Sequence, residues 1–322
     1  MTTLPYCFFP TKVACIDDDE NFAKALYFNT GKQKPSLQFF GNPDKALSIL
    51  NTQAKPNVMF ERILQTQDCP LDCSSVSYLY EEIYNPQRYE VISCALIGEQ
   101  IHGMDGLDVC RKITDPNIKK IYLTTNLEQE TAIAAFNEGI IDFYVHKNDP
   151  KALDSIDAYI DRSQAQYFEG RANKSIEPLL NEWHFSTHEV SALVDPLFIN
   201  YFKSLLESSN IQEYYLLDLI GSFLLINTKG EVSAYLTFTD PALALHMLDG
   251  VGALELEPHL WNKIGSKTLP SAFCMPSLYH PLFYNFEPFV MPVQSLVLGQ
   301  HQYSLAHIPK GGWSSSLIRK KN

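Results

Sequence analysis

Acidic, hydroxyl and basic side chains recur in a set order along the first half of this sequence. Asp17, Asp18 and Asp19 directly follow a short apolar run, Thr124 ends another, and Lys147 follows a third. In an open α/β sheet, functional groups collect beyond the carboxyl ends of the strands. Two adjacent carboxylates there could bind a hard divalent cation such as Mg2+. The order therefore predicts one site that combines an acid pair, a hydroxyl group and an amine.

The elements that would position these groups alternate between strands and helices. Short apolar runs, typical of buried parallel strands, are separated by amphipathic stretches. The predicted strands are Val13–Ile16, Leu37–Phe40, Val91–Ile97, Lys119–Leu123 and Ile140–Val145. Five such βα units predict a doubly wound parallel sheet with helices on both faces.

Four stretches of this half resemble the receiver domain of two-component response regulators. They are Val13–Asp19, Gly103–Leu107, Ile121–Thr125 and Asp142–Lys147, and they stand in the family's order. The resemblance covers Pro10–Gln166, about half of the chain. It implies a CheY-like α/β fold with the strand order 2-1-3-4-5.

The resemblance also implies roles for single residues. Asp17 and Asp18 match the acids that hold Mg2+ in receivers. Thr124 matches the switch hydroxyl, and Lys147 matches the cation that pairs with the phosphoryl group. Tyr144 stands where receivers carry an aromatic residue that changes rotamer.

The position of the phosphoacceptor departs from the family. Counting back from Gly103–Gly106 places it on Gly98, which has no side-chain oxygen. Glu99 could stand in for the acceptor, but strand alternation directs its side chain to the opposite face unless the backbone slips by one residue. Asp105 and Asp108 lie beyond the loop and are poor substitutes. We therefore expect a pseudo-receiver or an acceptor-substituted form, which takes up no aspartyl phosphate at Gly98 and binds Mg2+ weakly.

The same residues also have plainer interpretations. The three aspartates could cap the following helix and interact favourably with its dipole. Taken singly, Thr124 would be a capping residue, Lys147 a surface residue and Tyr144 a packing residue. Cys69 and Cys73 could supply two zinc ligands, and His184 and His188 are four residues apart, but neither pair has further ligands at a usual spacing.

Composition restricts the class of protein. The formal net charge of −12 argues against a main role in holding nucleic acid or anionic lipid. Seven cysteines, an odd number, favour buried free thiols in a reducing compartment. Tyr214–Ile226 is the most apolar stretch, but it contains Asp218 and is too short to span a bilayer. Met1–Lys12 lacks the charged start of a secretory signal. These features predict a cytoplasmic protein without a membrane segment.

The length of 322 residues predicts two domains. We expect a receiver-like domain over residues 10–148, with an insertion at 52–88, and a linking helix over 149–172. Residues 173–322 are expected to form an α+β output domain. Its antiparallel sheet would include Glu213–Phe238, where short apolar runs are separated by turn residues.

The output half shows no catalytic motif, which favours a non-enzymatic output over an enzyme, and no helix-turn-helix pattern, so we expect no DNA binding. The layout is similar to that of bacterial orphan regulators, including quorum-sensing response regulators of the Legionella type. It predicts a signalling regulator whose output recognises a protein or a small ligand. A sensor kinase or another signalling protein would be its partner, and residues 127–137 and 149–167 could form a homodimer contact. The alternative is an enzyme or nucleotide-binding output, which a pocket containing Asp218, His280 and His307 would favour.

Overall fold

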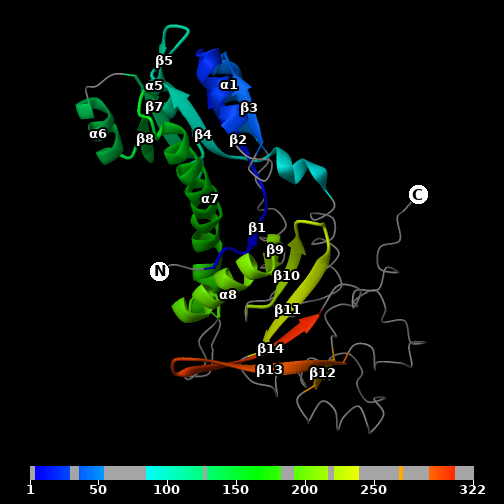
Figure 1. The fold of residues 1–322 in the computed structure, drawn as a ribbon. Helices are drawn as coiled ribbons and strands as arrows, with labels where there is room; N and C mark the ends of the chain where they lie inside the picture. The colour runs from blue at the N-terminus through cyan, green and yellow to red at the C-terminus, as the bar shows by residue number, and fades with distance from the viewer. Residues whose placement is uncertain are drawn as a thin grey trace. The chain divides into compact units, whose positions relative to one another are not determined.

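The structure is a computed structural model, and it divides the chain into two compact units. It describes residues 4–29, 36–53, 85–125, 129–182, 192–216, 221–238, 268–270 and 290–308. Residues from Pro10 to Arg171 within these ranges form the first unit, which we call the α/β unit. Residues up to Phe9 and from Ala172 onward belong to the second, which we call the antiparallel unit. Figure 1 labels most of their helices and strands.

The α/β unit is built on a parallel sheet. Within the described residues the order of its five strands is β3-β2-β4-β7-β8, which is 2-1-3-4-5 in chain order and confirms the predicted fold. Neighbouring strands are parallel, with Ile16 paired to Ile97 and Gly98 paired to Leu123. The strands are β2 (Lys12–Ile16), β3 (Leu37–Phe40), β4 (Ile92–Gly98), β7 (Lys119–Thr124) and β8 (Phe143–His146).

Helices cover both faces of this sheet. On one face, α1 and α7 contribute Leu26, Ile156 and Ile160 to a core with alternate residues of β2, β4 and β7. On the other face, α2 and α5 lie against the sheet and against each other. All seven residues of β4 are buried, as expected of a central strand whose sequence is continuously apolar. The helices are α1 (Glu20–Asn29), α2 (Pro43–Thr52), α5 (Gly106–Lys112), α6 (Gln129–Asn137) and α7 (Ala152–Glu182), with the 3-10 turn η1 at Pro86–Glu90.

A small hairpin separates β4 from α5. Its strands, β5 (Gln100–Ile101) and β6 (Met104–Asp105), are antiparallel and joined by His102 and Gly103. Both turn residues have positive φ, 50° and 85°, as two-residue hairpin turns of type I′ require. Asp105 then caps α5 by accepting a hydrogen bond from the Leu107 backbone N–H at 2.9 Å. The hairpin therefore ends β4 at Gly98 and redirects the chain.

The chain passes from the α/β unit to the antiparallel unit within α7, between Arg171 and Ala172. This helix has 31 residues and continues ten residues beyond the predicted linking helix. Its first part is fixed to the α/β unit by Ile156 and Ile160, and by Gln164, whose amide donates to the Thr11 hydroxyl at 2.7 Å. No helix in the described ranges combines the length and the apolar character that a membrane span requires.

The antiparallel unit confirms the prediction of an antiparallel sheet in the second half. In the described residues its seven strands follow the order β1-β9-β10-β11-β14-β13-β12. The meander predicted within Glu213–Phe238 corresponds to β9, β10 and β11. The elements are β1 (Cys7–Phe8), α8 (Pro196–Ser208), β9 (Ile211–Leu216), β10 (Phe223–Asn227), β11 (Val232–Phe238), β12 (Thr268–Pro270), β13 (Val290–Leu298) and β14 (His301–Ile308).

The N-terminal segment supplies a strand of this sheet, which the sequence analysis did not foresee. Cys7 pairs with Tyr215 and Phe8 with Tyr214 in an antiparallel register. Phe9 is 1% exposed and stacks on the ring of Tyr215. Residues separated by more than two hundred positions along the chain thus share one core.

Several predicted features lie outside the described residues. These are most of the 52–88 insertion, Cys69, Cys73, His184, His188, Asp218 and His280.

Candidate functional site

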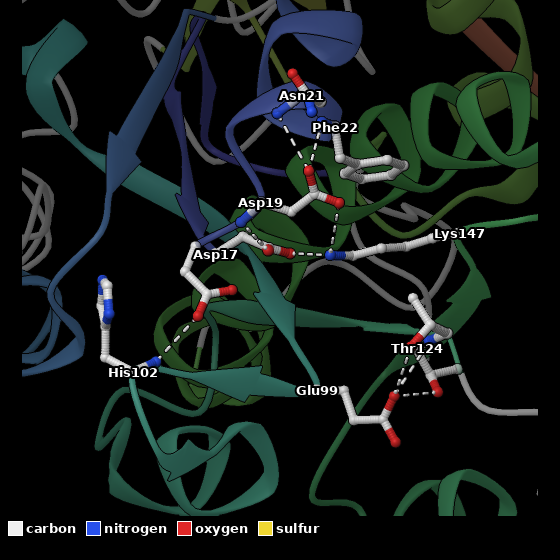
Figure 2. Close-up of polar contacts among 10 residues, drawn as sticks. Asp17, Asp19, Asn21, Phe22, Glu99, His102, Thr124 and Lys147 are labelled. Carbon is white, nitrogen blue, oxygen red and sulfur yellow. Dashed lines mark hydrogen bonds and ion pairs between the residues drawn. The ribbon is translucent and has the colours of Figure 1, made fainter.

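The carboxyl end of β2 carries a buried ion pair. Asp17 directly follows β2, and Lys147 directly follows β8. The Lys147 amine lies 2.7 Å from the Asp17 carboxylate, and these side chains are 10% and 2% exposed. The amine also lies 5.0 Å from the ring centre of Phe22, where the π face favours a cation. Figure 2 shows Lys147 reaching back toward the aspartates.

The other two aspartates have separate partners. Asp19 accepts hydrogen bonds from the Asn21 and Phe22 backbone N–H groups, at 3.1 and 3.0 Å, so it caps α1. It also lies 3.9 Å from the Lys147 amine. Asp18 is exposed and accepts a hydrogen bond from the His102 backbone N–H at 3.2 Å. The capping interpretation thus describes Asp19, whereas Asp17 and Asp18 face the sheet edge and the hairpin.

Gly98 lies at the centre of this edge. It is the last residue of β4, and a Cβ atom there would lie 2.6 Å from the Asp17 Oδ2 atom. Gly106 approaches β4 even more closely, because a Cβ on it would lie 1.9 Å from the Gly98 carbonyl oxygen. The Asp17 carboxylate therefore occupies the space that a side chain at position 98 would enter.

Glu99 contacts the same edge, and the strand-alternation argument about its direction was wrong. Its Oε2 atom accepts hydrogen bonds from the Thr124 hydroxyl at 3.0 Å and from the Thr125 backbone N–H at 3.1 Å. The Thr125 hydroxyl lies 3.4 Å from the same oxygen. Alternation does not apply because β4 ends at Gly98 and the chain bends before β5. Figure 2 shows the Glu99 carboxylate directed toward Thr124.

The two aromatic residues of the edge lie on neighbouring strands. Tyr144 is half-buried on β8 and pairs with Tyr122 of β7.

Burial raises the pKa of the Tyr122 hydroxyl, and the nearby Glu99 carboxylate raises it further. Burial and the Asp17 carboxylate likewise raise the pKa of the Cys15 thiol to about 12. Both groups are therefore neutral at physiological pH, and the charges of the edge belong to its carboxylates and to Lys147.

The residues present do not fit a complete Mg2+ site. Mg2+ prefers an octahedral shell of oxygen atoms, in which carboxylates are the usual protein ligands. Here Asp17 faces Lys147, Asp18 faces the hairpin backbone, and Gly98 supplies no carboxylate. In the described part of the chain, no three acidic, histidine or cysteine side chains are grouped where they could hold a metal ion.

A second polar cluster occurs in the antiparallel unit. Asp195, which is 2% exposed, caps α8 by accepting a hydrogen bond from the Leu197 backbone N–H. It also accepts one from the Tyr303 hydroxyl at 2.5 Å and lies 2.9 Å from His301 Nδ1. Burial opposes the charged form of Asp195, but the hydrogen bonds from Tyr303 and His301 outweigh it and lower the pKa of this carboxyl.

Sequence reasoning missed this cluster. Its only local signal is Asp195-Pro196, a typical helix start. His307 is one of the three residues whose presence in one pocket would favour an enzymatic output. It lies on β14 and stacks on the ring of Tyr235.

The strand order and the residues at the sheet edge together define an α/β fold of the receiver type. No protein-family model matches the chain, and no curated protein matches its sequence. Over nearly its whole length the chain is similar in structure to the Legionella pneumophila response regulator LqsR. The two are 26% identical with a TM-score of 0.70, and the match covers 96% of this chain and 90% of LqsR.

Isolated receivers match only part of the chain. A CheY-like receiver domain protein from Methanospirillum hungatei is 14% identical with a TM-score of 0.33, covering 48% of this chain and 97% of its own. The response regulator TrrA from Thermotoga maritima, in complex with Mg2+-BeF, is 14% identical with a TM-score of 0.31, covering 48% and 98%.

Proposed function

We propose that this chain is a response regulator that signals without an aspartyl phosphate at position 98. Its output half would recognise a protein or a small ligand rather than DNA, and its partners would be a sensor kinase or another signalling protein. The layout that resembles Legionella-type quorum-sensing regulators extends this proposal to quorum sensing.

One observation carries the proposal. Gly98 ends the central strand at the site edge, and the Asp17 carboxylate fills the space beside it. That carboxylate is in turn paired with the Lys147 amine, which receivers are expected to keep for a phosphoryl group. Position 98 therefore offers no side-chain oxygen, and the Asp17 carboxylate beside it is paired with the Lys147 amine.

Incubation with acetyl phosphate, followed by intact mass and peptide mapping, tests this proposal. We expect no stoichiometric adduct within residues 95–100. Gly98→Asp should take up a phosphoryl group there, once the Asp17 carboxylate turns aside. Gly98→Ala is the matched control, because it introduces the same Cβ atom without an acceptor oxygen. A stoichiometric adduct of the unaltered chain within this segment would overturn the proposal.

Asp17 and Asp18 leave a limited capacity for Mg2+. With one of the usual carboxylates missing, a bound ion would have to retain more of its water. We therefore propose weak binding at this acid pair, with water as most of the ligands.

Assembly through the helices α6 and α7 is also a proposal. Ile133 and Phe136 of α6 are 44% and 52% exposed, which leaves apolar surface on this helix. Light scattering at high micromolar concentration tests it, and a monomer there would exclude the dimer.

A further inference from the structure

The beginning of the loop after β7 presents three hydrogen-bond donors to a single oxygen atom. They are the Thr124 hydroxyl, the Thr125 backbone N–H and the Thr125 hydroxyl, at 3.0, 3.1 and 3.4 Å from Glu99 Oε2. We call these three donors the threonine cradle. Donors that converge on a charged oxygen form stronger hydrogen bonds than they would with a neutral acceptor. The cradle is therefore suited to an oxyanion.

The backbone holds Glu99 in place to reach this cradle. β4 and β7 are neighbours, with Gly98 paired to Leu123. The Glu99 carbonyl oxygen accepts a hydrogen bond from the Gly106 N–H at 2.9 Å, which fixes the residue between β4 and α5. Thr124 is 8% exposed, so its hydroxyl is largely shielded from competing water. The carboxylate thus reaches the donors from a fixed position on an adjacent strand end.

The acidic side chains of the edge have two different kinds of partner: the Lys147 amine and the threonine cradle. The Lys147 amine contacts Asp17 and Asp19, at 2.7 and 3.9 Å, and these contacts hold it at the end of β2. Glu99 instead receives its hydrogen bonds from the threonine cradle. Figure 2 shows the two groups as separate sets of contacts. The negative charge of Glu99 is therefore stabilised by the cradle and not by the lysine.

We infer that Glu99 is a built-in ligand that fills an oxyanion site formed by the threonine cradle. The carboxylate joins the end of β4 to Thr124 and Thr125 and holds these two residues in one arrangement without any covalent modification. This inference rests on the proposed function, because it explains how the edge is kept ordered when position 98 carries no acceptor. It concerns a non-covalent contact, so its test does not depend on whether an adduct forms.

Hydrogen–deuterium exchange of the full chain tests the inference at peptides that contain Thr124 and Thr125. In Glu99→Ala we expect the Thr125 amide to exchange about tenfold faster, the effect of losing its hydrogen bond to a charged acceptor. Glu99→Gln should lie between the two, because its amide oxygen still accepts hydrogen bonds but carries no charge. Millimolar inorganic phosphate should restore protection in Glu99→Ala, whereas chloride at equal ionic strength should not.

Glu138→Gln is the matched control, since Glu138 is an exposed carboxylate in the same unit. It should leave the exchange at Thr124 and Thr125 unchanged. Unchanged exchange in Glu99→Ala would show that the carboxylate does not hold these two residues. Faster exchange that phosphate fails to reverse would show that the cradle is not an oxyanion site. Either result overturns the inference while leaving the acetyl phosphate test unaffected.

Discussion

Among single residues, the buried Asp17 carboxylate depends most on one partner. Replacing Lys147 with methionine leaves this 2%-exposed carboxylate without its cation. We expect Lys147→Met to destabilise the α/β unit by about 3 kcal/mol, because an unpaired buried charge is strongly unfavourable. Urea denaturation followed by circular dichroism measures the change.

The exposed pair of Lys24 and Glu20 provides the comparison. Its side chains are 66% and 85% exposed, so the ion pair is screened by water. Lys24→Met should therefore change the stability by less than about 0.5 kcal/mol. Equal effects of the two substitutions would show that the Asp17–Lys147 pair is solvated in solution.

The buried thiols of the α/β unit are a second property of single residues. Burial raises the pKa values of Cys15, Cys94 and Cys110 to about 12. Because only the thiolate reacts, and about one thiol in ten thousand is ionised at pH 8, alkylation should be very slow. Native protein treated with iodoacetamide at pH 8 should stay unlabelled at these three positions, and denatured protein should be labelled fully. Rapid native labelling of Cys15 would mean that the site edge opens readily.

Among the elements, the β5–β6 hairpin determines where the site side chains point. The strands on either side were predictable, because a continuous apolar run such as that of β4 is a local signal. The direction of Glu99 was not predictable by the same means. It depends on β4 ending at Gly98, and that end is set by His102 and Gly103, whose positive φ angles close the two-residue turn.

Gly106 follows this hairpin and lies directly against the end of β4. Its substitution tests whether the chain needs this close approach. A Cβ atom in Gly106→Ala would lie 1.9 Å from the Gly98 carbonyl oxygen, so the backbone must move. We expect a loss of about 3 kcal/mol in unfolding free energy, typical of severe overpacking. Gly103→Ala meets no atom within 4 Å and should lose only about 1 kcal/mol, from its positive φ. Chemical denaturation of both variants would measure this difference, and equal losses would contradict the close approach.

In the molecule as a whole, contacts between distant segments limited what could be predicted. The receiver-like sheet follows from consecutive βα units, each with its own local pattern. The cluster of Asp195, His301 and Tyr303 joins residues more than one hundred positions apart, and only the helix cap has a local signal. The pairing of β1 with β9 joins residues more than two hundred positions apart and involves only two residues of strand, Cys7 and Phe8.

The N-terminal strand gives the last prediction, because it makes the antiparallel unit depend on residues that precede the receiver. Leu4, Tyr6 and Phe9 are each at most 2% exposed. A chain that lacks residues 1–9 should lose roughly 5 kcal/mol from the antiparallel unit, the burial of three large side chains.

Two substitutions separate loss of packing from loss of the strand itself. Successive side chains of a strand point to opposite faces, and Phe9 is buried whereas Phe8 is only half-buried. Phe9→Ala should therefore cost about 3 kcal/mol, and Phe8→Ala clearly less. Differential scanning calorimetry should show a lower unfolding temperature for the antiparallel unit and an unchanged transition for the α/β unit. If deletion of residues 1–9 shifted neither transition, β1 would contribute nothing to the sheet in solution.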